Sequence, residues 1–213
     1  TRMIGGLIMV HSDDYGLVLP PKIAPKQVVI IPIKMTEKVM EKSQSIKNLL
    51  LENDIEAYID DSEKSAGFKF AEAEVNGIPI RIEIGERDLL NNNLVFVRRD
   101  TREKITVPVD TDILKYTKEL LDRIQNDMYN RALERRKSLT FEAHSLKDIE
   151  DILNKQPGFI HAMWCGNKEC EEKIKEIKGC KSRCILESKD YENEKCVVCG
   201  KDVYVVVRKL NIM

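Results

Sequence analysis

Four of the six cysteines in this chain have the spacing of metal ligands. Four residues separate Cys165 from Cys170, and two residues separate Cys196 from Cys199, which Gly200 follows. Two short cysteine pairs from distant points of a chain are a common way of building a tetrahedral Zn²⁺ site. A closed site of four thiolates leaves no open position for water. We therefore expect one zinc ion that stabilises the fold and performs no chemistry.

The remaining cysteines, Cys180 and Cys184, allow three interpretations: metal ligation, pairing with each other, or two free thiols. We expect no ligation, because four thiolates already complete a closed site and Arg183 precedes Cys184 where a glycine follows the Cys196 pair. Buried or disulfide-bonded thiols are the alternative for the whole set. The sequence has no secretory segment, which favours reduced thiols and the cytoplasm.

The composition is that of a soluble globular protein. Of the 213 residues, 33% are charged and 42% are hydrophobic, and 35 Lys and Arg nearly balance 36 Asp and Glu. Without a global positive field, a nucleic-acid partner must be held by a local patch. No apolar run approaches the ~20 residues of a membrane helix. His11, His144 and His161 lack the spacing of a Cys-His nucleophile, so we assign no catalytic acid or base.

The hydrophobic pattern predicts an α/β domain. A β-branched run at residues 28–33, a helix over 37–53 and a strand over 55–59 indicate parallel strand pairing. A short helix is expected to end near Asn76 and Gly77. In residues 78–85 the isoleucines alternate with Arg81 and Glu83, so one face of that strand is apolar and the other is charged.

Aromatic, acidic and basic residues come close together around this strand. Residues 86–89 are predicted to turn the chain, and residues 94–98 and 104–107 are predicted to form a hairpin. Bases in RNA need stacking surfaces, and arginine or a carboxylate can read a guanine edge. A solvated charged face is the alternative, and composition alone favours it.

The rest of the chain predicts a long helix and a second, smaller α/β region. The helix covers residues 110–139, with an apolar stripe from Ile113 to Leu133 and a basic end that is either a solvated terminus or a contact for a nucleic-acid backbone. Ser145 is expected to cap a helix that reaches Lys155. A strand over 158–163, a helix over 167–178 and strands at 185–186 and 203–207 complete the small region.

Three successive segments resemble one family. Thr1 to Met9, followed by His11 to Pro25, looks like the third signature motif of a class II aminoacyl-tRNA synthetase, and more narrowly of the archaeal and eukaryotic-like prolyl-tRNA synthetases. In that family the motif arginine, matched by Arg2, binds the triphosphate of ATP, which suits a guanidinium fork. The chain begins inside an apolar, helix-like run, so we expect it to be the C-terminal part of a longer protein.

The second segment is similar to the anticodon-binding domain of the same family, a five-stranded mixed sheet flanked by helices. Phe-Lys-Phe at 68–70, residues 74–89 and residues 97–104 carry the resemblance. It implies that the two guanines of the proline anticodon are held by Phe70, Glu74, Arg81, Arg87, Asp88 and Lys104. The chain departs from the family at Ala73, where tryptophan is common, and at Glu86, where proline is common.

The third segment, residues 158–170 together with 196–201, looks like the small α/β zinc-binding C-terminal domain of that synthetase group. The four ligands of the family match Cys165, Cys170, Cys196 and Cys199 in type and spacing, and Cys184 matches a frequent non-ligand cysteine. Where the family usually ends in tyrosine, this chain ends in residues 211–213, Asn-Ile-Met.

The resemblance implies three regions: a remnant of the catalytic domain at 1–26, the anticodon-binding domain at 27–135 and the zinc-binding domain at 136–213. It implies a ligase that joins proline to its tRNA through a prolyl-adenylate, with ATP and Mg²⁺ serving the intact enzyme and a homodimer forming through the catalytic domain. The first two class II motifs are not in this sequence. A non-catalytic tRNA-binding module of the same ancestry is therefore the alternative.

Overall fold

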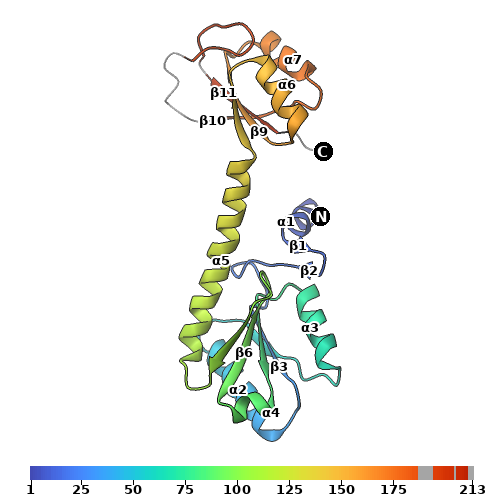
Figure 1. The fold of residues 1–213 in the computed structure, drawn as a ribbon, viewed down its shortest axis with the longest axis vertical. Helices are drawn as coiled ribbons and strands as arrows, with labels where there is room; N and C mark the ends of the chain where they lie inside the picture. The colour runs from blue at the N-terminus through green and yellow to red at the C-terminus, as the bar shows by residue number, and fades with distance from the viewer. Residues whose placement is uncertain (187–193, 204, 211–213) are drawn as a thin grey trace. The chain divides into compact units, whose positions relative to one another are not determined.

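The structure, a computed structural model, describes residues 1–186, 194–203 and 205–210 (Figure 1). The chain divides into two compact units, Thr1–Asn130 and Arg131–Met213. Among the described helices, none combines the length and the apolar character that crossing a membrane requires. Tyr204 and the C-terminal residues 211–213, where the sequence departs from the family ending, lie outside the described residues.

The helices and strands are bounded as follows. Up to residue 138 they are, in chain order, α1 (Arg2–Val10), β1 (Ser12–Asp13), β2 (Gly16–Leu17), β3 (Val28–Pro32), α2 (Glu37–Leu51), β4 (Ala57–Ile59), α3 (Ala66–Val75), β5 (Ile80–Ile84), α4 (Glu86–Leu90), β6 (Asn93–Arg98), β7 (Lys104–Pro108) and α5 (Ile113–Ser138). From residue 140 they are β8 (Thr140–Ala143), α6 (Leu146–Lys155), β9 (Phe159–Trp164), α7 (Lys168–Glu176), β10 (Ser182–Leu186) and β11 (Val205–Leu210).

The first unit is built on a five-stranded mixed sheet in the order β4-β3-β5-β6-β7, which confirms the predicted fold class. Strand β3 pairs in parallel with both β4 and β5, whereas β5-β6 and β6-β7 are antiparallel. Parallel neighbours need crossover connections, which α2 and α3 supply, while the antiparallel strands are joined by short links. Strand β5 is therefore the central strand of the sheet.

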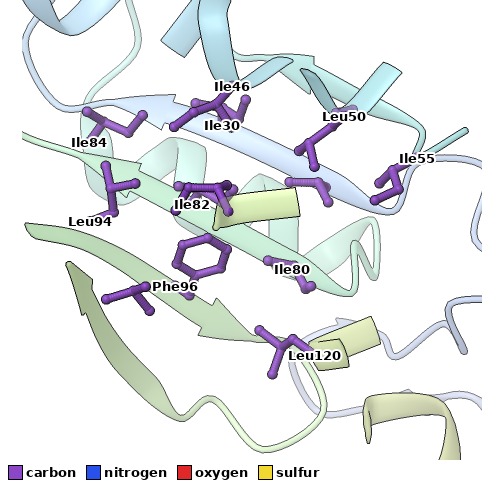
Figure 2. Close-up of a cluster of buried hydrophobic side chains, with 14 of the residues drawn as sticks. Ile30, Ile46, Leu50, Ile55, Ile80, Ile82, Ile84, Leu94, Phe96 and Leu120 are labelled. Carbon is purple, nitrogen blue, oxygen red and sulfur yellow. The ribbon is translucent and has the colours of Figure 1, made fainter. Parts of the chain in front are cut away.

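One face of this sheet carries the main hydrophobic core. Ile80, Ile82 and Ile84 of β5 are fully buried there, together with Phe96 of β6. Figure 2 shows these side chains between the strands and the helices that cover this face. The covering residues come from α2 and α5: Val39, Ile46, Leu50, Ile113, Leu120, Leu121 and Ile124. Alternation along β5 thus directs every second residue into this core.

Helix α3 packs on the opposite face of the sheet. Val29 and Ile31 of β3 contact Ala73 of α3 and Ile78 in a small second core, with Phe70 partly buried beside it. Because successive side chains of a strand point to opposite faces, the residues of β5 between its isoleucines lie on this α3 side. They are the charged residues that the sequence pattern assigned to that face.

A hairpin near the N-terminus is fixed to the end of α3. Gly16 has φ +134°, and a Cβ there would lie 2.4 Å from the Val75 Cα, so only glycine fits. Arg99, almost fully buried, donates to both carboxylate oxygens of Asp13 at 2.9 and 2.6 Å and to the Glu74 carbonyl at 3.0 Å. The Arg99 guanidinium holds the pKa of Asp13 well below its usual range.

The second unit contains a four-stranded sheet in the order β10-β11-β9-β8. Strands β8 and β9 are parallel, and the other two pairs are antiparallel. The predicted cap of α6 is present, because the Ser145 hydroxyl accepts a hydrogen bond from the Asp148 backbone N–H at 3.1 Å. Ile149, Ile160 and Ile174 form the centre of a small core between the helices and the sheet.

Three details differ from the sequence-based expectations. Residues 86–89, predicted as a simple turn, form the first four residues of helix α4. Strand β8 was not predicted, because its polar-apolar alternation, Thr-Phe-Glu-Ala, is only four residues long. The apolar stripe of α5 is buried only as far as Ile124, with Met128 partly buried and Ala132 exposed, because the core of the first unit, within the described residues, ends there.

The central position of Ile82 predicts a large effect of truncation. Ile82→Ala removes apolar volume from a site with no exposed surface and should lower the free energy of unfolding of the first unit by about 2–5 kcal/mol. Ile33→Ala is the matched control, because Ile33 follows β3 and is 40% exposed. Urea unfolding followed by circular dichroism checks this, and equal effects of the two substitutions would contradict the assigned core.

Candidate nucleic-acid interface and metal centre

Helix α3 and strand β5 bring three of the predicted anticodon-binding residues together. Phe70 and Glu74 are one turn apart on α3, so their side chains share a face of the helix. Arg81 of β5 lies against both: its guanidinium carbon is 4.4 Å from the centre of the Phe70 ring, and its Nη1 donates to Glu74 Oε1 at 3.2 Å. Nη1 also donates to the Phe70 carbonyl at 3.4 Å.

Lys104 joins this cluster from the first position of β7. Its Nζ lies 5.8 Å from the centre of the Phe70 ring and donates to Glu83 Oε2 at 3.4 Å. The Lys104 side chain is 60% exposed, whereas that of Glu83 is 10% exposed. The cluster therefore combines a half-buried aromatic ring with two carboxylates and two cations, and its formal charges cancel.

These groups suit an unpaired RNA base better than a phosphate backbone. A splayed-out base needs an aromatic or guanidinium surface for stacking and polar groups for its Watson–Crick edge. A backbone site needs an excess of positive charge, which this cluster lacks. For guanine, a carboxylate can accept from the N–H groups of the base and a cation can donate to its carbonyl oxygen.

The other predicted binding residues lie elsewhere. Arg87 and Asp88 are on α4, which follows the C-terminal end of β5; Arg87 is exposed and Asp88 is half-buried. Within the part of the chain that the structure describes, no hydrogen bond or ion pair joins them to the Phe70 cluster. Arg2 is exposed at the first position of α1.

The sequence reasoning did not assign Glu83 to the site. Its signal was the alternation in β5, which places Glu83 two residues after Arg81 on the same face of the sheet. What could not be read from the sequence was the pairing with Lys104 across the sheet. Ala73, where the family commonly has tryptophan, is buried against Val29 and Ile31 and leaves the Phe70 side of α3 close to the sheet.

The second unit brings together the four cysteines that the spacing predicts as ligands. The sulfur atoms of Cys165, Cys170, Cys196 and Cys199 all lie within 4.8 Å of one another. The Cys165 sulfur is 3.7 Å from that of Cys170 and 3.6 Å from that of Cys199. A tetrahedral ion with metal–sulfur bonds of about 2.3 Å separates its sulfur atoms by roughly 3.8 Å. Two of the separations match this value, and all four sulfur atoms are close enough together to bind one ion.

Local structure places each thiol. Cys165 follows β9, and Cys170 lies in the first turn of α7, whose N-cap Asn167 accepts from the Glu169 N–H at 2.9 Å. The second pair lies in a tight turn, where the Gly200 N–H donates to the Cys196 carbonyl at 2.9 Å and Gly200 has φ +67°. A glycine is favoured there because the backbone is left-handed.

Close packing changes the acidity of the thiols. Burial, together with the sulfur atoms of Cys199 and Cys165, raises the pKa of Cys170 to about 12. Burial also opposes ionisation of Cys196, but backbone hydrogen bonds from Cys199 and Val198 outweigh it and lower its pKa to about 7. Because the thiolate is the form that binds metal, Cys196 is the thiol best prepared for ligation near neutral pH.

The other cysteines and His161 lie outside this cluster. Cys180 is buried in the small core, and Cys184 is exposed on β10. The Nδ1 atom of His161 is 2.8 Å from Glu142 Oε1, an arrangement typical of a structural histidine. It gives no support for an acid or base role.

Two families match this chain in successive regions. The family described as "Anticodon binding domain" matches residues 27–120, and "Prolyl-tRNA synthetase, C-terminal" matches residues 146–208. The fold and the two sites thus define an anticodon-binding domain of an aminoacyl-tRNA synthetase followed by a second, cysteine-containing domain. The chain belongs to the prolyl-tRNA synthetase family.

Individual relatives agree with this assignment. The chain is 47% identical over 208 residues to the proline–tRNA ligase of Lachnoclostridium phytofermentans. The matched region is 97% of this chain and 43% of the relative. It is 46% identical over 202 residues to that of Clostridium botulinum strain Loch Maree, covering 94% and 42%. The crystal structure of prolyl-tRNA synthetase from Cryptosporidium parvum with L-proline and AMP superimposes with a TM-score of 0.89 at 31% identity, covering all of this chain and 46% of that one. The chain spans less than half the length of each of these relatives.

The geometry of the thiols predicts which cysteines are needed for metal. Cys199→Ser should lose or severely weaken metal binding, because it removes one of four thiolates of a closed site. Cys184→Ser, the matched control on β10, should retain one ion per chain. Elemental analysis of the purified proteins measures both.

Acidification should release the ion, because protons compete with it for the thiolates.

Loss of the ion from the Cys184→Ser protein, with a full equivalent kept by Cys199→Ser, would show that the ligand set is wrong.

Proposed function

We propose that this chain supplies anticodon recognition and a structural zinc domain to a prolyl-tRNA synthetase, which attaches proline to its tRNA in an ATP-dependent reaction through a prolyl-adenylate. The observation that carries the proposal is the cluster of Phe70, Glu74, Arg81 and Lys104 on the α3 face of the sheet. These four come from three separate elements, yet Arg81 and Lys104 both lie beside the Phe70 ring and Arg81 also contacts Glu74. They are also four of the six positions that the family resemblance implies.

Each residue of the cluster has a distinct role in this proposal. Phe70 offers a surface on which an anticodon base stacks. Glu74, with 23% of its side chain exposed, accepts hydrogen bonds from the N–H groups of guanine. Arg81 and the exposed Lys104 donate to the carbonyl oxygen and ring nitrogen of the base. Arg87 and Asp88 on α4 are proposed to contact the second guanine.

The site distinguishes guanine from other bases by the cost of unpaired polar groups. A base without the matching donors and acceptors would displace water from Glu74 and Lys104 and return no hydrogen bonds in a partly desolvated site. A site built on hydrogen bonds rejects such a base more strongly than an apolar pocket does.

We propose that the ion held by Cys165, Cys170, Cys196 and Cys199 is zinc in a structural role. Four cysteine sulfur atoms within 4.8 Å of one another are the donor set of closed Zn²⁺ sites, which have no position for a reacting water. The ligands come from the residue after β9, from α7 and from a distant turn, so one ion links three parts of this small unit. Its binding free energy then contributes directly to the folding of this unit.

The remaining partners belong to the whole enzyme. We propose that it uses proline, ATP and Mg²⁺, acts on proline tRNA, forms a homodimer through its catalytic domain and works in the cytoplasm. Arg2 at the start of α1 is proposed to contact the triphosphate of ATP. We propose the domain boundaries 1–26, 27–135 and 136–213 for this part of the enzyme.

Substitution of Arg81 tests the proposed function. Arg81→Ala should weaken binding of the cognate proline tRNA by about 1–3 kcal/mol, the value of a good base contact, and should affect a tRNA with altered anticodon guanines much less. Lys38→Ala is the control, because it removes one positive charge from an exposed position on α2. Equilibrium titrations with both tRNAs measure the difference.

Equal weakening of both tRNAs by Arg81→Ala would make Arg81 a backbone contact and would overturn its assignment as a base reader.

A further inference from the structure

Glu83 is a nearly buried carboxylate at the centre of the charged face of the sheet. It lies on β5 between the core residues Ile82 and Ile84, and 10% of its side chain is exposed. A carboxylate with so little access to water is retained only where cations and hydrogen-bond donors compensate its lost hydration. The partners of Glu83 therefore indicate what it does.

Each oxygen of Glu83 holds one cation of the candidate site. Oε1 accepts a hydrogen bond from Arg81 Nε at 3.0 Å, and Arg81 Nη2 lies 3.0 Å from the same oxygen. Oε2 accepts from Lys104 Nζ at 3.4 Å. Glu83 thus connects β5 with β7 and draws Arg81 and Lys104 toward one point.

Glu83 also sets the orientation of the Arg81 guanidinium. Nε and Nη2 on one side of the group are held by Glu83, while Nη1 faces Glu74 and the Phe70 carbonyl at the longer distances of 3.2 and 3.4 Å. This arrangement keeps the guanidinium 4.4 Å from the ring centre of Phe70. A planar guanidinium stacks and donates productively only in such a fixed orientation.

We propose that Glu83 is a positioning residue for guanine recognition, which acts through Arg81 without touching the RNA itself. The inference rests on the proposed anticodon role of this cluster. Because both Glu83 oxygens already bind cations and the side chain is nearly buried, its influence on a base in a single-stranded loop is indirect. Glu83 fixes the side chain of Arg81 before the base arrives, so less conformational entropy is lost on binding.

The test uses the 213-residue chain and two anticodon stem-loop RNAs, one with the guanines of the proline anticodon and one with adenines in their place. Glu83→Gln keeps the shape of the side chain but removes the charge that holds Arg81. We expect the guanine-over-adenine preference to fall about tenfold, within the range for loss of a bidentate base contact. Glu72→Gln is the control, because it neutralises a half-buried glutamate of α3 that pairs with Lys64, and should keep the preference.

A double-mutant cycle separates positioning from a direct contact or a general loss of structure. If Glu83 acts through Arg81, Glu83→Gln should cause no further loss of preference in an Arg81→Gln background. Additive losses in the double variant, or an unchanged preference in Glu83→Gln alone, would overturn the proposal. Should Glu83→Gln fail to fold, Glu83→Asp keeps the charge and shortens the side chain by one methylene, and the same cycle is run with it.

The failure of this inference is distinguishable from failure of the proposed function. If the unmodified chain binds the guanine and adenine stem-loops equally, the anticodon role itself is wrong. If the unmodified chain prefers guanine and Arg81→Gln abolishes that preference while Glu83→Gln does not, only the positioning role of Glu83 is wrong.

Discussion

The alternation of apolar and charged side chains along β5 is the constraint on which the first unit depends. This strand lies at the centre of the sheet, and helices cover both of its faces. Ile80, Ile82 and Ile84 complete the main core on one side, and the same pleat places Arg81 and Glu83 under α3 on the other. A shift of one residue in register would bury two charges in the apolar core and expose the isoleucines.

The charged face of β5 is costly, and its geometry shows how the cost is reduced. Arg81 and Glu83 are buried almost completely, but each is paired, and Glu74 and Lys104 extend the pairing toward water. Buried ion pairs contribute little net stability compared with apolar side chains of similar size. Their presence in the middle of a sheet is explained more readily by binding than by folding.

The sequence was sufficient to predict much of the fold, for reasons that are local. The isoleucine alternation at 78–85, the Ser145 cap and the left-handed Gly77 all depend on neighbouring residues, and all are present. The cysteine pairs were equally readable, because ligand spacing is a local property of two short turns. What remained hidden depends on distant partners: Asp13 and Arg99 are 86 positions apart, and Glu83 meets Lys104 only after the β5-β6-β7 meander forms.

The central claim is that the Phe70 cluster reads the edge of guanine. Removing one functional group from the base tests this claim most directly. Inosine lacks only the 2-amino group of guanine. This group is a hydrogen-bond donor, and a carboxylate such as that of Glu74 can accept a hydrogen bond from it. Replacing the anticodon guanines one at a time with inosine should weaken stem-loop binding to the chain by about tenfold at the position that Glu74 reads. Equal affinity for guanine and inosine at both positions would contradict the account.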